Sequence, residues 1–431
     1  MAILIEHVNL KKTLIFFYIW VLLEGILRKW VVPGLSNALF LGKLVFSIYF
    51  AFVLIKTNRK KILQDKNIII ALTIYMLFLC FSFCLGALNF GPIVPILGLS
   101  VHVAYFPLFF MIPLALKTKQ GLFKFLNFLN FIILLVFILG IYQYTLPPDH
   151  FLNKYVAETE YISQVGNAVR ITTIFPYITL SQYYIVFTAL LSFAQFVLNS
   201  GNKLIVSINV ILGVACVFMT GSRYSLGFYI FTSVLFLMLA KPFKVISFKQ
   251  FARIFIVLPV LVLIGLQTSF FQNSLENFQS RINNSDSSEG RLLEIFTPFK
   301  FSETAGFFGH GLGVTASPAQ SFIYDRSSLP SYWEEESERI AIEQGMLGFI
   351  ILVIFRFTVL LFLFKVMNRE KDKKLRGLLL FFFIYQIPAV LVMSQTNYAY
   401  IENIIYCSQI GVLLFIAARQ KQRYIDESYS I

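Results

Sequence analysis

Arginines at the ends of apolar segments are the residues of this sequence best suited to chemistry. Arg223 follows Gly221 and Ser222 in the motif TGSR, at the start of an expected helix. A helix start supplies free backbone N–H groups and the positive end of the helix dipole, and an arginine beside it can bind a phosphate group through two parallel hydrogen bonds. The pattern predicts a pyrophosphate site at Arg223. The alternative is an interfacial arginine at a short turn.

Lys43 and Glu24 are charged residues inside apolar segments, where a charge is costly unless it is paired or hydrated. Lys43 either extends to the membrane interface or contacts an anionic ligand, and both readings stay open. Glu24 and Arg28 are four residues apart, the spacing of an ion pair on one helix face. We expect that pair to be structural.

A run of carboxylates, WEEESER, lies immediately before a long apolar segment. Such a charge run is usually a solvated face. At a membrane entrance, however, one of its glutamates can act as a general base that takes a proton from a hydroxyl group. Glu334 and Glu336 are the candidates, and the residues alone do not choose between them.

The sequence contains no metal-binding or nucleotide-binding motif. DxD, HExxH and EF-hand spacings are missing, as are a P-loop and a dinucleotide fingerprint. The four cysteines all lie in apolar segments and form no CxxC pair. We therefore expect chemistry that uses neither a metal nor a cofactor.

The composition places these residues in a membrane protein. Hydrophobic residues make up 58% of the chain and charged residues only 13%, whereas about a quarter of an ordinary soluble chain is charged. Uniformly apolar runs of about 20 residues recur, each long enough to cross a hydrocarbon core of about 30 Å. This pattern predicts an all-α polytopic membrane protein and excludes a transmembrane β-barrel. The net charge of +14 reflects Lys and Arg in loops on one side of the membrane and not a nucleic-acid partner.

About twelve membrane spans are predicted, at residues 13–27, 37–55, 67–86, 92–116, 122–145, 174–198, 203–220, 222–240, 251–267, 339–364, 377–395 and 402–418. The span at 92–116 contains three prolines and is expected to be kinked or broken. Lys and Arg are enriched in alternate loops, which places both termini in the cytoplasm.

Two long polar loops then lie on the outer face of a single membrane-embedded domain of residues 1–431. The shorter covers residues 146–173, and the longer covers residues 269–338, between the ninth and tenth spans. Loops of this length are usually functional or disordered. The longer loop contains a turn-like GHGLG motif and helical spacing of apolar residues, so we expect turns and short helices there.

Four short features of the sequence, taken together, resemble the O-antigen polymerase and O-antigen ligase superfamily. They are TGSR at a span start, Arg291 ahead of an aromatic-rich segment, GHGLG, and EQGMLG at the next span. The span number and the long external loop are similar as well. The resemblance implies a multi-pass glycosyltransferase of the bacterial cytoplasmic membrane. Such an enzyme polymerises undecaprenyl-pyrophosphate-linked oligosaccharides into O-antigen or capsule on the outer face, with inversion and without a metal.

The resemblance also assigns residues to the substrate. In the family, external arginines engage the pyrophosphate of the lipid carrier, and the matching positions are Arg223 and Arg291. Arg291 is in addition a catalytic candidate, and Arg170, at the end of the shorter loop, is a candidate by position. Lys43 remains the fourth candidate contact for the anionic ligand.

The sequence departs from the ligase pattern at one place. Ligase-type members carry a histidine before the glutamate of the E-x-G-(L/M)-x-G element. Here that glutamate is Glu343, and Glu334, nine residues earlier, occupies the position of the histidine. The departure favours a polymerase over a ligase and gives the acceptor-activating role to Glu334 or Glu336.

Other classes stay open as alternatives. A ligase would transfer the glycan to a lipid or protein acceptor, and a transporter would move lipid-linked oligosaccharides. Transporters often carry internal repeats, and the two halves of this sequence show none. The implied partners are the lipid-linked glycan, the bilayer, a chain-length regulator and other polysaccharide-assembly proteins.

Overall fold

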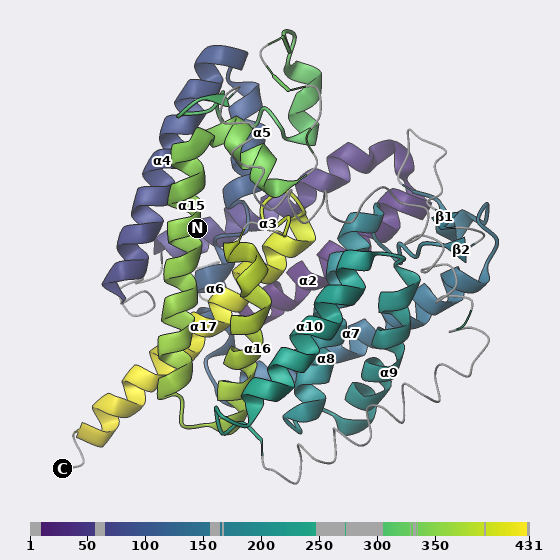
Figure 1. Cartoon of the computed structure of the whole chain (residues 1–431), viewed down its shortest axis with the longest axis vertical. Helices are drawn as coiled ribbons and strands as arrows, with labels where there is room; N and C mark the ends of the chain where they lie inside the picture. Colours follow the sequence, from purple (N-terminus) through teal and green to yellow (C-terminus); the bar gives the residue numbers. More distant parts are fainter. Residues whose placement is uncertain are drawn as a thin grey trace. The chain divides into compact units, whose positions relative to one another are not determined.

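The computed structural model describes residues 10–56, 65–155, 164–165, 168–246, 272, 305–327, 329–330, 333, 335–391 and 394–428. These residues form an all-α structure (Figure 1). The chain divides into two compact units, each built from three stretches of sequence. Unit 1 comprises Met1–Phe46, Met111–Ser285 and Met367–Ile384, and unit 2 comprises Ser47–Phe110, Asp286–Val366 and Tyr385–Ile431. That the two units act as one membrane-embedded domain stays a prediction.

Long apolar helices confirm that the chain is a polytopic membrane protein. Among the described residues, seven helices are long and apolar enough to cross a membrane: Lys66–Phe90, Ile93–Leu116, Lys119–Thr145, Ile178–Val197, Arg223–Ala240, Glu336–Arg369 and Tyr400–Gln422. Two shorter apolar helices are Gly42–Ile55 and Lys203–Met219. Each of these helices coincides with a segment that the apolar runs predict. The predicted span at residues 251–267 lies outside the described residues.

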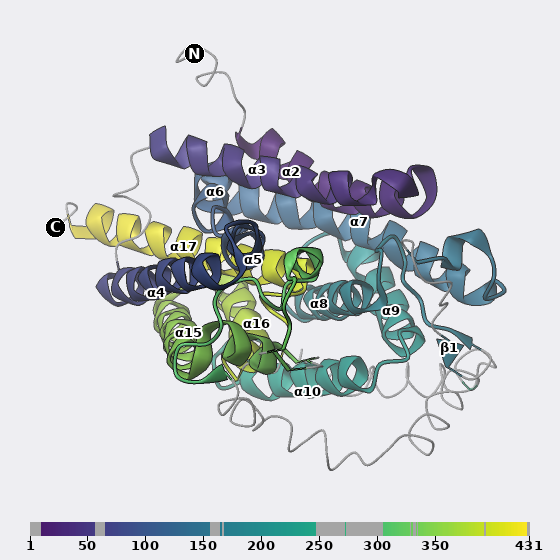
Figure 2. The same cartoon turned by 90° about the horizontal axis from the view of Figure 1, so that it is seen from above.

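Unit 1 is a helical bundle centred on α8. Its elements are α2 (Leu10–Ile26), the π-helical turn η1 (Leu27–Val31), η2 (Pro33–Leu35), the first half of α3 (Ser36–Lys56), α7 (Lys119–Thr145), α8 (Ile178–Val197), α9 (Lys203–Met219), α10 (Arg223–Ala240) and most of α16 (Lys373–Val390). Helix α8 packs against α9 and α10, and α9 also packs against α7 (Figures 1 and 2). Gly213 of α9 faces Ala189 of α8, where a Cβ atom would come within 2.9 Å of the alanine side chain. Small residues at this contact let the two helices approach closely.

Buried amides connect three helices of unit 1. Asn130 of α7 donates to the side chain of Gln195 of α8 at 2.7 Å, and Asn209 of α9 donates to the carbonyl of Asn130 at 2.9 Å. Because all three side chains are buried, these hydrogen bonds fix how far each helix is shifted along its axis relative to the other two.

The described residues of the shorter polar loop in unit 1 lie beside the end of α7. It contains η4 (Phe151–Asn153) and the strands β1 (Gln164–Val165) and β2 (Ala168–Val169), which pair antiparallel with Gln164 opposite Val169. The amide of Gln143 in α7 donates to the carbonyl of Leu152 at 2.8 Å. The two-residue strands leave the fold class all-α.

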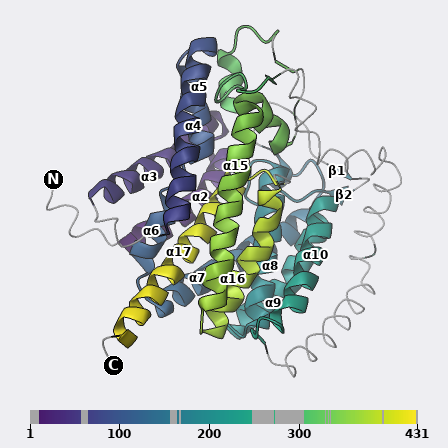
Figure 3. The ribbon, with the colours of Figure 1, turned by 60° about the vertical axis from the view of Figure 1, so that its left-hand side comes forward.

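Unit 2 contains α4 (Lys66–Phe90), α5 (Ile93–Val103), the first residues of α6 (Leu108–Leu116), η6 (Ser317–Phe322), most of α15 (Glu336–Arg369) and α17 (Tyr400–Ser428). The predicted break in the span at 92–116 is confirmed, because α5 ends at Val103 and α6 begins at Leu108. Pro107 has no backbone N–H to continue the helix. Helix α4 packs against α5 (Figure 3), and η6 packs against α5 as well.

The GHGLG motif forms the predicted turn and packs on α4 and α5 through glycines. Gly309, Gly311 and Gly313 all have positive φ angles, of 75°, 113° and 92°. A Cβ atom on Gly311 would lie 2.3 Å from the Cα of Gly86, and one on Gly98 would lie 2.4 Å from the Cα of Gly313. Glycine is therefore required here both by conformation and by close approach.

The same turn completes a broken helix. Helix α15 is interrupted at Gly345, whose φ and ψ angles are 65° and −171°. The carbonyl groups of Ile342 and Glu343 accept hydrogen bonds from His310 N at 2.8 Å and Gly311 N at 3.0 Å. The turn thus supplies the donors that the interrupted helix lacks. The apolar run from 339 to 364 predicts a continuous span and gives no sign of this interruption.

Substituting Gly311 by Ala should destabilise unit 2 strongly, because the new methyl group meets the backbone of Gly86. Gly306→Ala is the matched control: Gly306 also has a positive φ, of 66°, but its Cβ would meet nothing within 4 Å. We expect Gly306→Ala to cost about 1–2 kcal/mol and Gly311→Ala clearly more. Thermal unfolding of the purified variants in detergent measures the difference, and equal melting temperatures would contradict the packing argument.

Candidate functional site

The structure brings Arg170 and Arg223 to one turn of unit 1. Arg170 Nε donates to the carbonyl oxygen of Thr220 at 2.8 Å, and Arg223 is the first residue of α10, three positions further along the chain. Both side chains are partly exposed. Ser222 caps α10, as its hydroxyl accepts a hydrogen bond from Ser225 N at 3.3 Å. The predicted helix start at TGSR is therefore confirmed, and both arginines are accessible beside it.

Backbone pairing holds the segment that carries Arg170 against this turn. Ile171 N donates to the carbonyl of Met219 at 3.2 Å, one residue before the carbonyl that Arg170 contacts. Gly221 adopts a positive φ angle of 61°, which allows the sharp turn between α9 and α10. Arg170, Arg223 and the start of a helix thus lie in one short region, an arrangement that suits a bound phosphate.

Lys29 contacts the same segment from another element. Its ammonium group donates to Thr172 Oγ1 at 2.7 Å and to the carbonyl of Thr173 at 2.8 Å, and it lies 4.8 Å from the centre of the Trp30 ring. Lys29 lies in η1, beyond the predicted first span, and is 6% exposed. No carboxylate of the described residues forms an ion pair with it. Burial lowers the pKa of Lys29 to about 7, and a nearby anion would favour its charged form.

Lys43 takes part in a buried ion-pair cluster. Glu24 accepts from Lys43 Nζ, with a shortest distance of 2.7 Å to Oε2, and from Arg28 Nη1 at 2.9 Å. The predicted pair of Glu24 and Arg28 is confirmed, and Lys43 is its third member. Because Lys43 is fully buried, its contact with an anionic ligand stays a prediction. The remaining site candidates, Arg291 and Glu334, lie outside the described residues.

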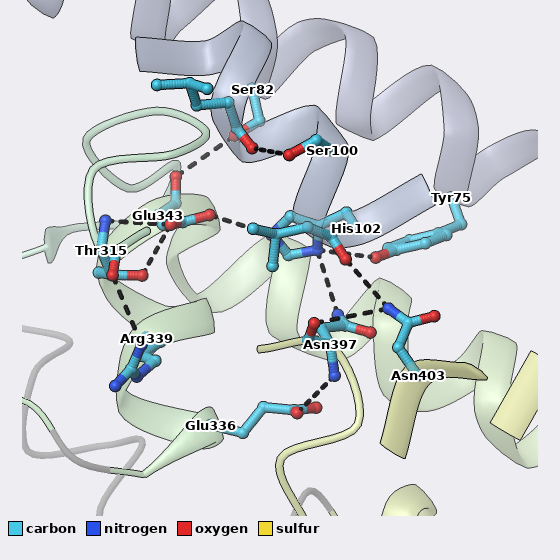
Figure 4. A network of polar contacts seen from close by, with 12 residues as sticks. Tyr75, Ser82, Ser100, His102, Thr315, Glu336, Arg339, Glu343, Asn397 and Asn403 are labelled. Atoms are coloured by element: carbon cyan, nitrogen blue, oxygen red, sulfur yellow. Dashed lines mark hydrogen bonds and ion pairs between the residues drawn. The ribbon is translucent and has the colours of Figure 1, made fainter. Parts of the chain in front are cut away.

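Unit 2 contains a buried polar network around Glu343 (Figure 4). Glu343 Oε1 accepts from the backbone N of Thr315 at 3.0 Å and from its hydroxyl at 2.7 Å. Glu343 Oε2 lies 3.0 Å from His102 Nε2. The carboxylate therefore joins α15, the loop after the GHGLG turn, and α5.

The partners of His102 define its tautomer. His102 Nδ1 lies 3.1 Å from the side-chain nitrogen of Asn397, which can only donate. The proton of the neutral ring is then on Nε2 and is donated to Glu343. The hydroxyl of Tyr75 is 3.4 Å from the same Nδ1. His102 thus connects the Glu343 carboxylate to α4 through Tyr75 and to the segment before α17 through Asn397.

Glu336, the candidate base within the described residues, is engaged on both oxygens. Oε1 accepts from Arg356 Nη2 at 2.5 Å, and Oε2 accepts from the backbone N of Asn397 at 2.8 Å. Arg356 also donates to the carbonyl of Ala389 at 2.7 Å, and both charged side chains are buried. In this arrangement Glu336 ties the start of α15 to the chain before α17. Its role as a base stays a prediction that requires release from Arg356.

Arg339 closes the Glu343 network into a ring of contacts. Its Nη1 lies 3.5 Å from the carbonyl of Thr315, and its guanidinium lies 5.1 Å from the ring centre of Tyr398. The Tyr398 ring in turn packs edge-on against His102, with centres 5.5 Å apart. These contacts support Thr315 and His102, the two partners of the buried Glu343 carboxylate.

Sequence reasoning did not find His102, Thr315 or Asn397. His102 had one available signal, since it is a polar residue in the proline-broken span and a buried polar group needs a partner. Thr315 and Asn397 have no signal of this kind, because a lone threonine or asparagine in a loop is common.

The chain matches no protein-family model and no curated protein sequence. Its function therefore has to be argued from the site geometry and the sequence motifs.

Removing the carboxylate of Glu343 should destabilise unit 2. Glu343→Ala leaves the N–H and hydroxyl of Thr315 and the Nε2–H of His102 buried without an acceptor, at a cost of about 1–3 kcal/mol each. Glu343→Gln keeps one acceptor oxygen and should cost less. Thermal unfolding in detergent tests this order, with Asp325→Asn as a control at an exposed carboxylate of the same unit. Wild-type stability of Glu343→Ala would contradict the assigned role.

Proposed function

We propose that the protein is a membrane glycosyltransferase that polymerises undecaprenyl-pyrophosphate-linked oligosaccharide repeat units into a surface polysaccharide, O-antigen or capsule. The reaction takes place on the outer face of the bacterial cytoplasmic membrane. The observation that carries the proposal is the meeting of Arg170 and Arg223 at one turn, since both are the arginines that motif and position assign to the pyrophosphate.

The chemistry of glycosyl transfer fits this placement. Transfer from a pyrophosphate leaving group needs stabilisation of the charge that develops on the departing phosphate. Arginine supplies this stabilisation through its planar, permanently charged guanidinium, which matches the geometry of phosphate oxygens. Two arginines at a helix start can therefore bind a diphosphate with their own donors and those of the backbone.

The second requirement is a base for the attacking hydroxyl. Glu334 and Glu336 are the proposed bases, with Arg291 assisting the leaving group. If Glu336 is the base, its ion pair with Arg356 has to open when the acceptor sugar arrives. If Glu334 is the base, Glu336 keeps its ion pair with Arg356 and its structural role.

The topology proposed for this function has twelve spans, with both termini in the cytoplasm and the two polar loops outside. The long apolar helices of the described residues support it. The substrate's lipid tail would lie against the apolar helices, and its sugars would lie under the 269–338 loop.

Replacing Arg170 or Arg223 by Ala should lower the rate of polymer formation by about 10- to 100-fold each, the effect of losing a charge-assisted hydrogen bond to phosphate. Arg223→Lys should recover only part of the rate, because lysine cannot form two parallel hydrogen bonds. The readout is the surface-glycan ladder of a complemented deletion strain, with protein amount in the membrane measured in parallel.

Arg326→Ala is the matched control, because Arg326 is an exposed arginine that is not among the residues assigned to the pyrophosphate or to the base. It should leave the ladder unchanged. Wild-type chain lengths in both Arg170→Ala and Arg223→Ala would remove the proposed function. A deletion strain with single repeat units on its surface indicates a polymerase, whereas one without surface glycan indicates a ligase.

Reporter fusions test the proposed topology. A reporter that works only outside the cytoplasm should be active when it is fused after Asn283. A reporter that works only in the cytoplasm should be active when it is fused after Lys371, because the positive residues around 371 retain that loop in the cytoplasm. The reverse pattern would overturn the side assignment of both loops.

A further inference from the structure

Residues 168–175 of unit 1, here called the bridging segment, carry Arg170 and are fixed along their whole length. Val169, Ile171, Ile174 and Phe175 are buried apolar side chains. On one side, Ile171 N and Arg170 Nε donate to the turn between α9 and α10. The position of the Arg170 guanidinium therefore depends on how this segment is held.

The other side of the bridging segment is held by η1 and α7. Lys29 donates to Thr172 Oγ1 and to the carbonyl of Thr173, and Gln143 of α7 donates to the same carbonyl at 2.9 Å. Thr173 has a positive φ angle of 48°, a conformation that a β-branched residue adopts only when its surroundings impose it. Lys29 and Gln143 are two of the groups that impose it.

The backbone of α2 is adapted to this contact. A Cβ atom on Gly25 would lie 2.2 Å from the carbonyl oxygen of Ile174, so a glycine is needed for the segment to approach. The helix then continues as the π-helical turn η1, which carries Lys29. Single π-helical turns within helices are rare and occur frequently at functional sites.

Burying Lys29 is costly for the fold. Its two oxygen partners are neutral, and a buried ammonium without a carboxylate loses hydration that neutral partners only partly replace. If packing were the only requirement, an apolar residue at position 29 with a shifted backbone would cost less free energy on folding than the buried lysine. Departures from such local rules are expected at functional sites.

We propose that Lys29 is a positioning residue for the anion site: by bonding Thr172 and Thr173 it fixes the bridging segment and so aims Arg170 at the pyrophosphate of the substrate. This inference rests on the proposed function. Direct contact of Lys29 with the ligand is the less favourable geometry, because its side chain is buried and already donates to two oxygens, whereas Arg170 is partly exposed.

A matched pair of substitutions at Thr172 tests the inference. Thr172→Val keeps the shape of the side chain but removes the acceptor for Lys29, whereas Thr172→Ser keeps the hydroxyl. The full chain in nanodiscs of zwitterionic lipid is titrated with inorganic pyrophosphate. We expect Thr172→Val and Lys29→Met to weaken binding about 3- to 10-fold, as expected for the loss of one hydrogen bond, and Thr172→Ser to bind as the wild type does.

A double-mutant cycle with Arg170 separates positioning from direct contact. If Lys29 acts through Arg170, Lys29→Met has no further effect on binding in an Arg170→Ala background. Hydrogen exchange gives a readout that does not depend on the ligand: peptides covering residues 168–175 should exchange faster in Thr172→Val and Lys29→Met than in Thr172→Ser.

The outcomes distinguish this inference from the proposed function. If Arg170→Ala weakens binding but Thr172→Val and Lys29→Met do not, the positioning role is wrong and the anion site stands. Additive effects in the double-mutant cycle would mean that Lys29 contacts the ligand itself and would also overturn the inference. If Arg170→Ala binds pyrophosphate as the wild type does, the anion site and the inference that rests on it are both wrong.

Discussion

The cost of burying charge among apolar helices is the constraint on which the structure depends. Three buried carboxylates have several specific partners: Glu24 has Arg28 and Lys43, Glu336 has Arg356 and a backbone N–H, and Glu343 has Thr315 and His102. An unpaired charge in such surroundings would cost several kcal/mol. These pairs therefore decide which loops and helix ends can meet within each unit. Removing one partner of such a pair lowers the free energy of unfolding by far more than the pair's net contribution, because the other charge stays buried and unpaired.

Against this background, the basic residues around residues 168–175 are the ones that point to a ligand. Arg170 donates to a carbonyl oxygen, and Lys29 donates to a hydroxyl and a carbonyl. Neutral oxygens orient a cation without cancelling its charge. The region around residues 168–175 and the α9–α10 turn thus gathers Lys29, Arg170 and Arg223, and a concentration of basic residues favours the binding of a pyrophosphate.

Sequence reasoning predicted the features that depend on local pattern. Apolar runs predict the helices, prolines predict the break between α5 and α6, and glycine spacing predicts the turn at 309–313. The i, i+4 spacing predicts the pair of Glu24 and Arg28.

Sequence reasoning could not predict features that depend on contacts between residues far apart in the chain. His102 and Glu343 are 241 positions apart, and no periodicity pairs them. The break at Gly345 was also missed, because its surroundings are apolar and its missing hydrogen bonds are supplied by a distant turn. The position of Arg170 at the end of the shorter loop predicts a role for it, but its contact with the TGSR turn depends on the three-dimensional structure.

The glycine contacts of unit 2 have a consequence for how related sequences can diverge. Gly86 meets Gly311, Gly98 meets Gly313, and Gly309 meets Gly345, in each case backbone against backbone. If one glycine of a pair is replaced by a larger residue, a smaller residue at the other position cannot compensate, because that position is already a glycine. These six positions are therefore closed to compensatory change, because a side chain at any of them requires the backbone opposite it to move.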